Sequence, residues 1–359
     1  MSHGEVEMQK PISEYAVYLR NLIPANIPES YALKPIFEDV ANDEDIRKGV
    51  VAFRDFLYIL CDRLISNGHL YVKLKKTRDP NDYPFLHNIT NLLVDIGYYG
   101  NLSENGESIL ISEIPVCTAP KARISGPATM ECLRFLAICG FDFAGIDLNA
   151  KLPDLSVNPF EVTYPANPLL LVGLKALSIA DIKLRESRRY WNDLFLLGCH
   201  YRLLQVDPPD MLGILKDYIH PLSDGLKQFA LEIYERYTDK GMIPATIRRA
   251  DVFFSFANIK NKNRNLSSQE IYEKRTFEFA ISMKHGFCLM VRSKKTDRYA
   301  DIIAAFPKYL KDKIAQGYGC DRKLRNEPCQ GGCQGIRIPF DESILTMKQD
   351  IITWLDQEV

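Results

Sequence analysis

Three of the chain's nine cysteines, Cys320, Cys329 and Cys333, lie close together in the basic segment GCDRKLRNEPCQGGCQG, residues 319–335. Cysteine thiolates bind zinc, and a structural zinc site takes four ligands that usually come as two close pairs in the sequence. Only Cys329 and Cys333 form such a pair here, with two glycines between them that let the chain turn. The segment is therefore a candidate zinc site that supplies three of the four ligands.

The fourth zinc ligand has to come from another part of the chain, and His285 and Cys288 are the candidates. Two other interpretations of the segment stay open. The neighbouring Arg322, Lys323 and Arg325 favour the thiolate form, which suits redox chemistry, although the spacing is not the C-x-x-C of thioredoxin-like proteins. The segment is otherwise a plain loop whose thiols are half-buried.

The other six cysteines stand singly in apolar segments. This distribution is typical of reduced, buried cysteines that pack as small hydrophobic side chains, whereas a secreted protein more often has paired spacings. The N-terminus lacks the basic start and apolar core of a secretory signal. We therefore expect a cytoplasmic protein. The six are Cys61, Cys117, Cys132, Cys139, Cys199 and Cys288.

Arg185, Arg188 and Arg189 are the candidate anion-binding residues, because they lie one helical turn apart in a segment that we predict to be helical through residue 205. Guanidinium groups on one helix face can hold an anionic ligand; the alternative is an exposed, salt-bridged stripe. A second basic segment, residues 248–264, contains several phenylalanines and could contact phosphates and bases. Its alternation VFFSF also predicts a plain sheet core.

The overall composition excludes several classes of protein. The formal net charge is −1, so the charge of the whole chain does not favour binding to nucleic acid or to an acidic membrane. The apolar stretches are interrupted by charges, which predicts no membrane span. The sequence contains no dinucleotide-binding, P-loop, zinc-protease or serine-hydrolase motif. Nucleic acid and a small ligand remain candidate partners.

With 359 residues and 25% charged residues, the chain predicts two globular domains of the α+β class, mostly helical with small antiparallel sheets. We expect an acidic N-terminal arm over 1–47, a helix-rich domain over 48–240 and a smaller module over 241–359.

The helix-rich domain shows a winged-helix-like order. Helical spacing over 48–67 is followed by an alternating strand pattern over 69–76, another helix over 84–97 and a hairpin turn at Asn105-Gly106. A weak internal repeat relates residues 92–115 to 136–165, each with a helix end, a glycine, two strands and a proline.

The C-terminal module has the order β-β-α-β-α. Strands TFEFAISM and GFCLMVRS flank a turn at Lys284-His285-Gly286, and the cysteine segment follows a helix over 297–317. The strand pair, the helix ending FPKYLKDKIAQG and the cysteine-bearing loop resemble the C-terminal module of an uncharacterised bacterial protein family. This resemblance covers the last quarter of the chain and implies a bacterial, cytoplasmic origin and a small α+β module, with no catalytic residues to carry over.

These features favour a non-enzymatic binding or regulatory protein whose ligand is a small molecule or nucleic acid. A more specific form of this hypothesis adds that zinc organises the thiol-rich loop. The alternative is an enzyme of unrecognised class with its site in a cleft between the two domains, where pockets tend to form. The acidic arm suggests a third class, a structural partner of another protein.

Overall fold

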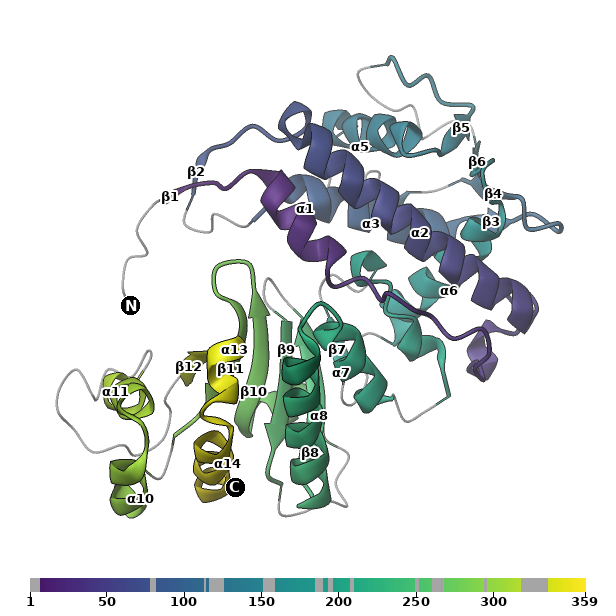
Figure 1. Ribbon diagram of the computed structural model, residues 1–359. Coiled ribbons are helices and arrows are strands. Elements are labelled where there is room, and N and C mark those ends of the chain that lie inside the picture. Colours follow the sequence, from purple (N-terminus) through teal and green to yellow (C-terminus); the bar gives the residue numbers. More distant parts are fainter. Residues whose placement is uncertain are drawn as a thin grey trace. The chain divides into compact units, whose positions relative to one another are not determined.

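The computed structural model describes residues 7–77, 82–112, 114–115, 126–150, 159–184, 190–192, 196–206, 210–248, 252–259, 266, 268–293, 296–317 and 335–359. The chain divides into two compact units, one of residues 1–185 with 194–209 and one of residues 186–193 with 210–359. Helices and small, mainly antiparallel sheets make up both units (Figure 1), so the predicted α+β class is confirmed.

The first unit is built around a helix that is apolar on nearly every side. This helix, α6 (Leu169–Lys183), buries Leu170, Leu174 and Leu177 among ten of its residues. A helix that is apolar all round has to be enclosed by other elements. Among its described residues, the unit also contains the α-helices α1 (Ile12–Arg20), α2 (Asp43–Asn67), α3 (Pro84–Tyr99) and α5 (Gly126–Ile138).

Glycines bring α2 and α3 into close contact with α6. A Cβ on Gly49 of α2 would lie 2.4 Å from the carbonyl oxygen of Leu169 and 2.5 Å from the amide nitrogen of Gly173. A Cβ on Gly97 of α3 would lie 2.2 Å from Ser178 Oγ. Since both contacts are far shorter than van der Waals distance, a larger residue at either position would push the helices apart.

The N-terminal segment is part of this unit. Helix α1 buries Ile12, Tyr15 and Leu19, and its Arg20 forms an ion pair with Asp62 of α2. The described part of segment 1–47 is therefore not a separate arm, because its apolar face is covered by the helix next to it.

The helix predicted over 48–67 is present, but the strand predicted over 69–76 is wrong. Residues Gly68–Leu70 form a short 3₁₀ helix, and only β2 (Lys76–Thr77) is a strand, paired with β1 (Glu7–Met8). The alternating pattern was misleading because a strand also needs a partner along its length, and β1 offers two residues.

A four-stranded sheet with the order β3-β4-β6-β5 completes the first unit. The Asn105-Gly106 turn joins the first two strands as predicted, with Gly106 at a φ of 72° that suits glycine. Residues 92–115 contribute β3 and β4, residues 136–165 contribute β5 and β6, and the inner strands β4 and β6 pair antiparallel. The strands are β3 (Asn101–Leu102), β4 (Ser108–Ile111), β5 (Asp142–Ala144) and β6 (Phe160–Thr163).

The second unit contains a six-stranded sheet with the order β12-β11-β10-β9-β8-β7. Strand β7 runs parallel to β8 and the other pairs are antiparallel. Gly286, with a φ of 64°, sits at the predicted turn between β10 and β11. The strands are β7 (Tyr190–Asn192), β8 (Ile243–Arg248), β9 (Val252–Ala257), β10 (Arg275–Ser282), β11 (Gly286–Val291) and β12 (Ile336–Pro339).

The helices of the second unit follow the predicted β-β-α-β-α order after residue 275. The helix predicted over 297–317 is divided at Phe306-Pro307, because proline lacks the amide hydrogen that continues a helix. The helices are α7 (Met211–Ile219), α8 (Asp224–Asp239), α9 (Ser268–Glu273), α10 (Ala300–Ala305), α11 (Lys308–Gln316), α13 (Glu342–Leu345) and α14 (Lys348–Glu358).

The boundary between the units differs from the division predicted at 240/241. Helix α8 packs on the six-stranded sheet, where the Tyr237 ring meets Phe277 edge-on at 4.9 Å between centroids. The Tyr237 hydroxyl donates to the Ile352 carbonyl and to Asp356 on α14. Residues 210–240 therefore belong with the second unit, because their apolar side chains pack on its sheet.

Within the described ranges, no helix combines the length and the apolar character needed to cross a bilayer.

Candidate functional site

A row of four residues crosses the six-stranded sheet on one of its faces. Strand pairing places Ser255 of β9 opposite Glu278 of β10, Glu278 opposite Met290 of β11, and Met290 opposite Arg337 of β12. Directly paired residues of antiparallel strands point to the same face. We call these four residues, with Arg275 and Arg292, the charged sheet face.

Glu278 is the centre of the charged sheet face and is fully buried. Arg275 Nε lies 2.7 Å from Glu278 Oε2, and Arg292 Nη2 donates to Oε1 at 3.0 Å. The Ser255 hydroxyl donates to Oε2, also at 3.0 Å. A carboxylate is tolerated in a dry interior only when paired and hydrogen-bonded, and this one has both kinds of partner.

The charged sheet face carries three guanidinium groups and one carboxylate. The side chains of Arg275 and Arg292 are 11% and 13% exposed, so both are largely shielded from water. Arg337 donates to Met290 Sδ at 3.9 Å. Because Arg337 adds a cation beside an ion-paired group, the six residues of the charged sheet face carry more positive than negative charges.

The titration of His285 provides a second sign of this positive potential. His285 lies in the turn between β10 and β11. Its pKa is lowered by burial, and then by the positive charges of Arg337 and Lys284. The imidazole is therefore neutral at physiological pH.

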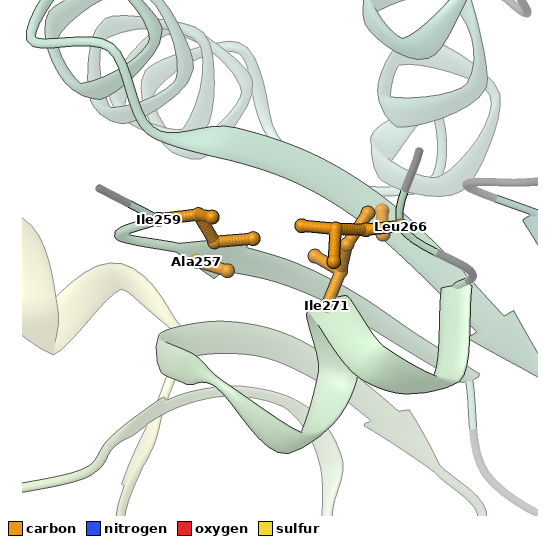
Figure 2. Close-up of a cluster of buried hydrophobic side chains, with 5 residues drawn as sticks. Ala257, Ile259, Leu266 and Ile271 are labelled. Carbon is orange, nitrogen blue, oxygen red and sulfur yellow. The ribbon is translucent and has the colours of Figure 1, made fainter. Parts of the chain in front are cut away.

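An apolar cluster borders the charged sheet face on the same side of the sheet. Ala245 of β8 pairs with Ser255, which continues the row of side chains toward β7. Figure 2 shows Ala257, Ile259, Leu266 and Ile271 gathered there, with Ile271 coming from α9. Helix α9 thus covers the apolar end of this face, while the charged residues lie toward β10–β12.

The opposite face of the sheet forms the aromatic core of the unit. Phe256 stacks on Phe277 at 4.7 Å between centroids, and Tyr234 of α8 contacts both Phe254 and Phe256. Figure 1 shows α8 and α14 in front of this sheet. The interpretation of VFFSF as a sheet core is confirmed, because Phe254 and Phe256 are buried by helices and unavailable for stacking on bases.

The candidate zinc ligands are only partly within the described residues. Cys320, Cys329 and Cys333 lie outside them. Cys288 is buried on β11, and its thiol donates to the carbonyl oxygen of His285 at 3.2 Å. Among the residues that the structure describes, no group of three His, Cys, Asp or Glu side chains is close enough to hold a metal ion.

The candidate anion-binding residues Arg185, Arg188 and Arg189 also lie outside the described residues. The helix that we predict through residue 205 is wrong on both sides of these arginines. Helix α6 ends at Lys183, and residues 190–192 form strand β7. Strand β7 pairs in parallel with β8 at the edge of the six-stranded sheet.

The cysteines outside the basic segment behave as expected where they are described. Five are free and buried. Burial raises the pKa of Cys139 to about 12, which leaves its thiol protonated and unreactive at neutral pH. Cys117 lies outside the described residues. The five are Cys61, Cys132, Cys139, Cys199 and Cys288.

Sequence reasoning missed the charged sheet face, although one signal was present. Glu278 stands between Phe277 and Phe279 inside a strand pattern, where a charged residue on an apolar run marks either a solvent face or a buried ion pair. Arg275 is three residues away on the same strand, but Arg292 follows β11, so it reaches Glu278 only through the pairing of β10 with β11.

Comparison of the chain with protein-family models, with curated proteins and with solved structures finds no match.

Proposed function

We propose that this chain is a non-enzymatic binding or regulatory protein and that its second unit binds an anionic ligand at the charged sheet face. The observation that carries the proposal is the placement of three arginines, Arg275, Arg292 and Arg337, around the single carboxylate of Glu278. The lowered pKa of His285 supports it, since that shift reflects burial and the positive charge of the same region.

Guanidinium chemistry defines the kind of ligand. The planar fork of arginine donates two parallel hydrogen bonds to carboxylate or phosphate oxygens. Glu278 holds Arg275 and Arg292 in fixed positions, so they lose little freedom when a ligand binds. Arg337 lies in the same row of side chains and contacts Met290, so its guanidinium group adds a third cation with which the ligand's charge can interact.

The test is calorimetric titration of the full chain with pyrophosphate, with citrate and with a short single-stranded oligonucleotide. We expect one of these anions to bind with an affinity that falls as salt increases. Arg337→Gln should weaken that binding about tenfold, as expected for the loss of one charge-assisted hydrogen bond. Arg134→Gln, the same change at an exposed position of helix α5 in the first unit, is the control.

Two results would contradict the proposal. One is the absence of binding by all three anions, and the other is equal binding by the Arg337→Gln and Arg134→Gln variants. A steep salt dependence with the oligonucleotide alone would assign the site to nucleic acid.

Zinc binding by Cys320, Cys329 and Cys333 stays a prediction that accompanies this proposal. Elemental analysis of protein purified without chelator tests the prediction, with a Cys329→Ser and Cys333→Ser variant as the control. We expect one zinc ion per chain that is lost in the variant; an absence of metal from the unaltered protein would contradict it.

The enzyme alternative, the bacterial family resemblance and the cytoplasmic location likewise stay predictions. A broad screen for turnover tests the first of them, because a non-enzymatic binding protein should leave every substrate unchanged.

A further inference from the structure

A small pocket in the first unit has a lining that combines aromatic rings with charges of both signs. It has a volume of about 230 Å³ and is lined by residues of the 71–75 segment, of α3 and of α5. This volume is slightly below the roughly 300–1,000 Å³ of pockets for drug-sized ligands. The pocket therefore fits a ligand no larger than a single metabolite or one unit of a polymer.

Backbone contacts hold the 71–75 segment at the mouth of this pocket. The Gln9 amide donates to the Lys75 carbonyl at 2.9 Å, continuing the β1–β2 pairing by one residue. The Gln9 side chain is 3% exposed and donates to the Asp82 carbonyl at 2.5 Å. Gln9 thus connects both the 71–75 segment and Asp82, which precedes α3, to the N-terminal strand, and these bonds anchor the pocket wall.

The aromatic part of the lining comes from Tyr71 and Phe85. Their rings are nearly parallel, with an interplanar angle of 14° and centroids 5.5 Å apart. Phe135 of α5 meets both rings edge-on, at 4.7 Å from Tyr71 and 5.4 Å from Phe85. The three rings support one another, so the aromatic surface of the pocket is rigid and suits a flat ligand ring.

The polar part of the lining is divided by charge. Lys73 and Lys75 are exposed cations on the segment at the mouth. Glu131 of α5 and Asn88 of α3 are partly buried, and they offer a carboxylate and an amide. A complementary ligand has a flat ring, N–H donors at the ring edge and an anionic group that reaches the lysines.

We infer that this pocket binds a nucleotide whose base carries an exocyclic amine, with the base against Tyr71 and Phe85 and the phosphate at Lys73 and Lys75. Glu131 accepts hydrogen bonds from the amine of the base. The same chemistry is present in a free mononucleotide and in one nucleotide of a single strand. The inference does not rest on the anion site of the second unit.

Calorimetric titration of the full chain with AMP, with adenosine and with inorganic phosphate tests the inference. We expect AMP to bind at least tenfold more tightly than adenosine or phosphate alone, because only AMP uses both parts of the lining. Lys73→Ser combined with Lys75→Ser should remove that advantage. Lys183→Ser, the same change at the exposed end of α6, is the control and should leave AMP binding unchanged.

Separate variants test the contacts that Tyr71 and Glu131 make with the ligand. Tyr71→Leu should weaken AMP binding about tenfold while Tyr71→Phe, which keeps the ring, should not. Glu131→Ala should abolish a preference for AMP over IMP, which lacks the exocyclic amine. Thermal unfolding of each variant separates a loss of binding from a loss of fold.

The inference is overturned if AMP does not bind, or if the Lys73→Ser, Lys75→Ser variant binds it as well as the Lys183→Ser control does. Arg337→Gln should leave AMP binding to this pocket intact, which distinguishes it from the anion site of the second unit. A four-nucleotide oligoadenylate that binds more tightly than AMP would identify a single strand as the source of the nucleotide.

Discussion

The four-stranded sheet of the first unit and the six-stranded sheet of the second unit, called the first and the second sheet below, differ in how they accommodate charge. The four-stranded sheet of the first unit buries one face, with Ile109 and Val162 enclosed while Leu110 and Glu161 face solvent. In the six-stranded sheet, strand β10 is buried at nearly every position, so its side chains on both faces are shielded from water. A charge on the first sheet remains in water, whereas Glu278 on the second has to be paired inside the protein.

This difference indicates where function can be sought. A glutamate on an exposed sheet face stays hydrated, so it costs little folding free energy and is weak evidence for a functional site. A buried carboxylate between two arginines costs several kcal/mol of desolvation per ion, offset only by good pairing. Because apolar residues of similar size could fill the same space, the charges of the second sheet call for a reason beyond stability, and anion binding supplies one.

The largest effect on stability is expected from removing the carboxylate of Glu278 at the centre of the charged sheet face. Glu278→Ala leaves Arg275 and Arg292 buried beside each other without their shared counter-charge. We expect the free energy of unfolding to fall by about 3–5 kcal/mol, measured by urea denaturation. A loss below about 1 kcal/mol would show that water enters this face freely, and the contrast between the two sheets would break down.

An intermediate effect is expected at the helix that covers the second sheet. Burial works against ionisation of Asp356 on α14, but hydrogen bonds from Arg236, Lys240 and Tyr237 lower its pKa to about 2. A depressed carboxylate pKa stabilises the fold above the pKa of the unfolded chain. That stabilisation, about 2 kcal/mol, is lost as the pH falls from about 4 to about 2.

The measurement is the free energy of unfolding of the unaltered chain and of the Asp356→Asn variant from pH 7 to pH 2. We expect a difference of about 2 kcal/mol at pH 7 that shrinks toward zero at pH 2. A difference that stays constant with pH would mean that packing of α14, and not the charge of Asp356, makes the contribution.

The smallest effect is expected on the exposed face of the first sheet. Glu161→Ala, the matched counterpart of Glu278→Ala, should change the free energy of unfolding by less than about 0.5 kcal/mol, measured by the same urea titration. A loss as large as that of Glu278→Ala would show that the first sheet is covered on both faces in solution.

The elements with a local signal were predictable from the sequence. The helix around Val50 and Phe53, the turn at Asn105-Gly106 and the hairpin at Gly286 each follow from spacing or turn chemistry that acts over a few residues. The strand predicted over 69–76 and the helix predicted through Tyr190 were wrong, because the presence or absence of a partner strand decided both and the local pattern does not reveal it.

The candidate sites likewise combine residues that the sequence marks with residues that only the fold brings together. Glu278 and the aromatic alternation of β9 can be read from the chain, but Ser255, Arg292 and Arg337 join Glu278 only through strand pairing. The pocket of the first unit likewise combines Gln9, Tyr71 and Glu131, which are far apart in the sequence.

The sequence by itself determined the α+β class, the buried and reduced cysteines that are described, and the order of the C-terminal elements, because these depend on hydrophobic periodicity and local turn chemistry. The tertiary structure alone decided that residues 210–240 belong with the second sheet, and which charges share a face. Those facts depend on register between distant strands, and a shift of one residue would move each side chain to the other face.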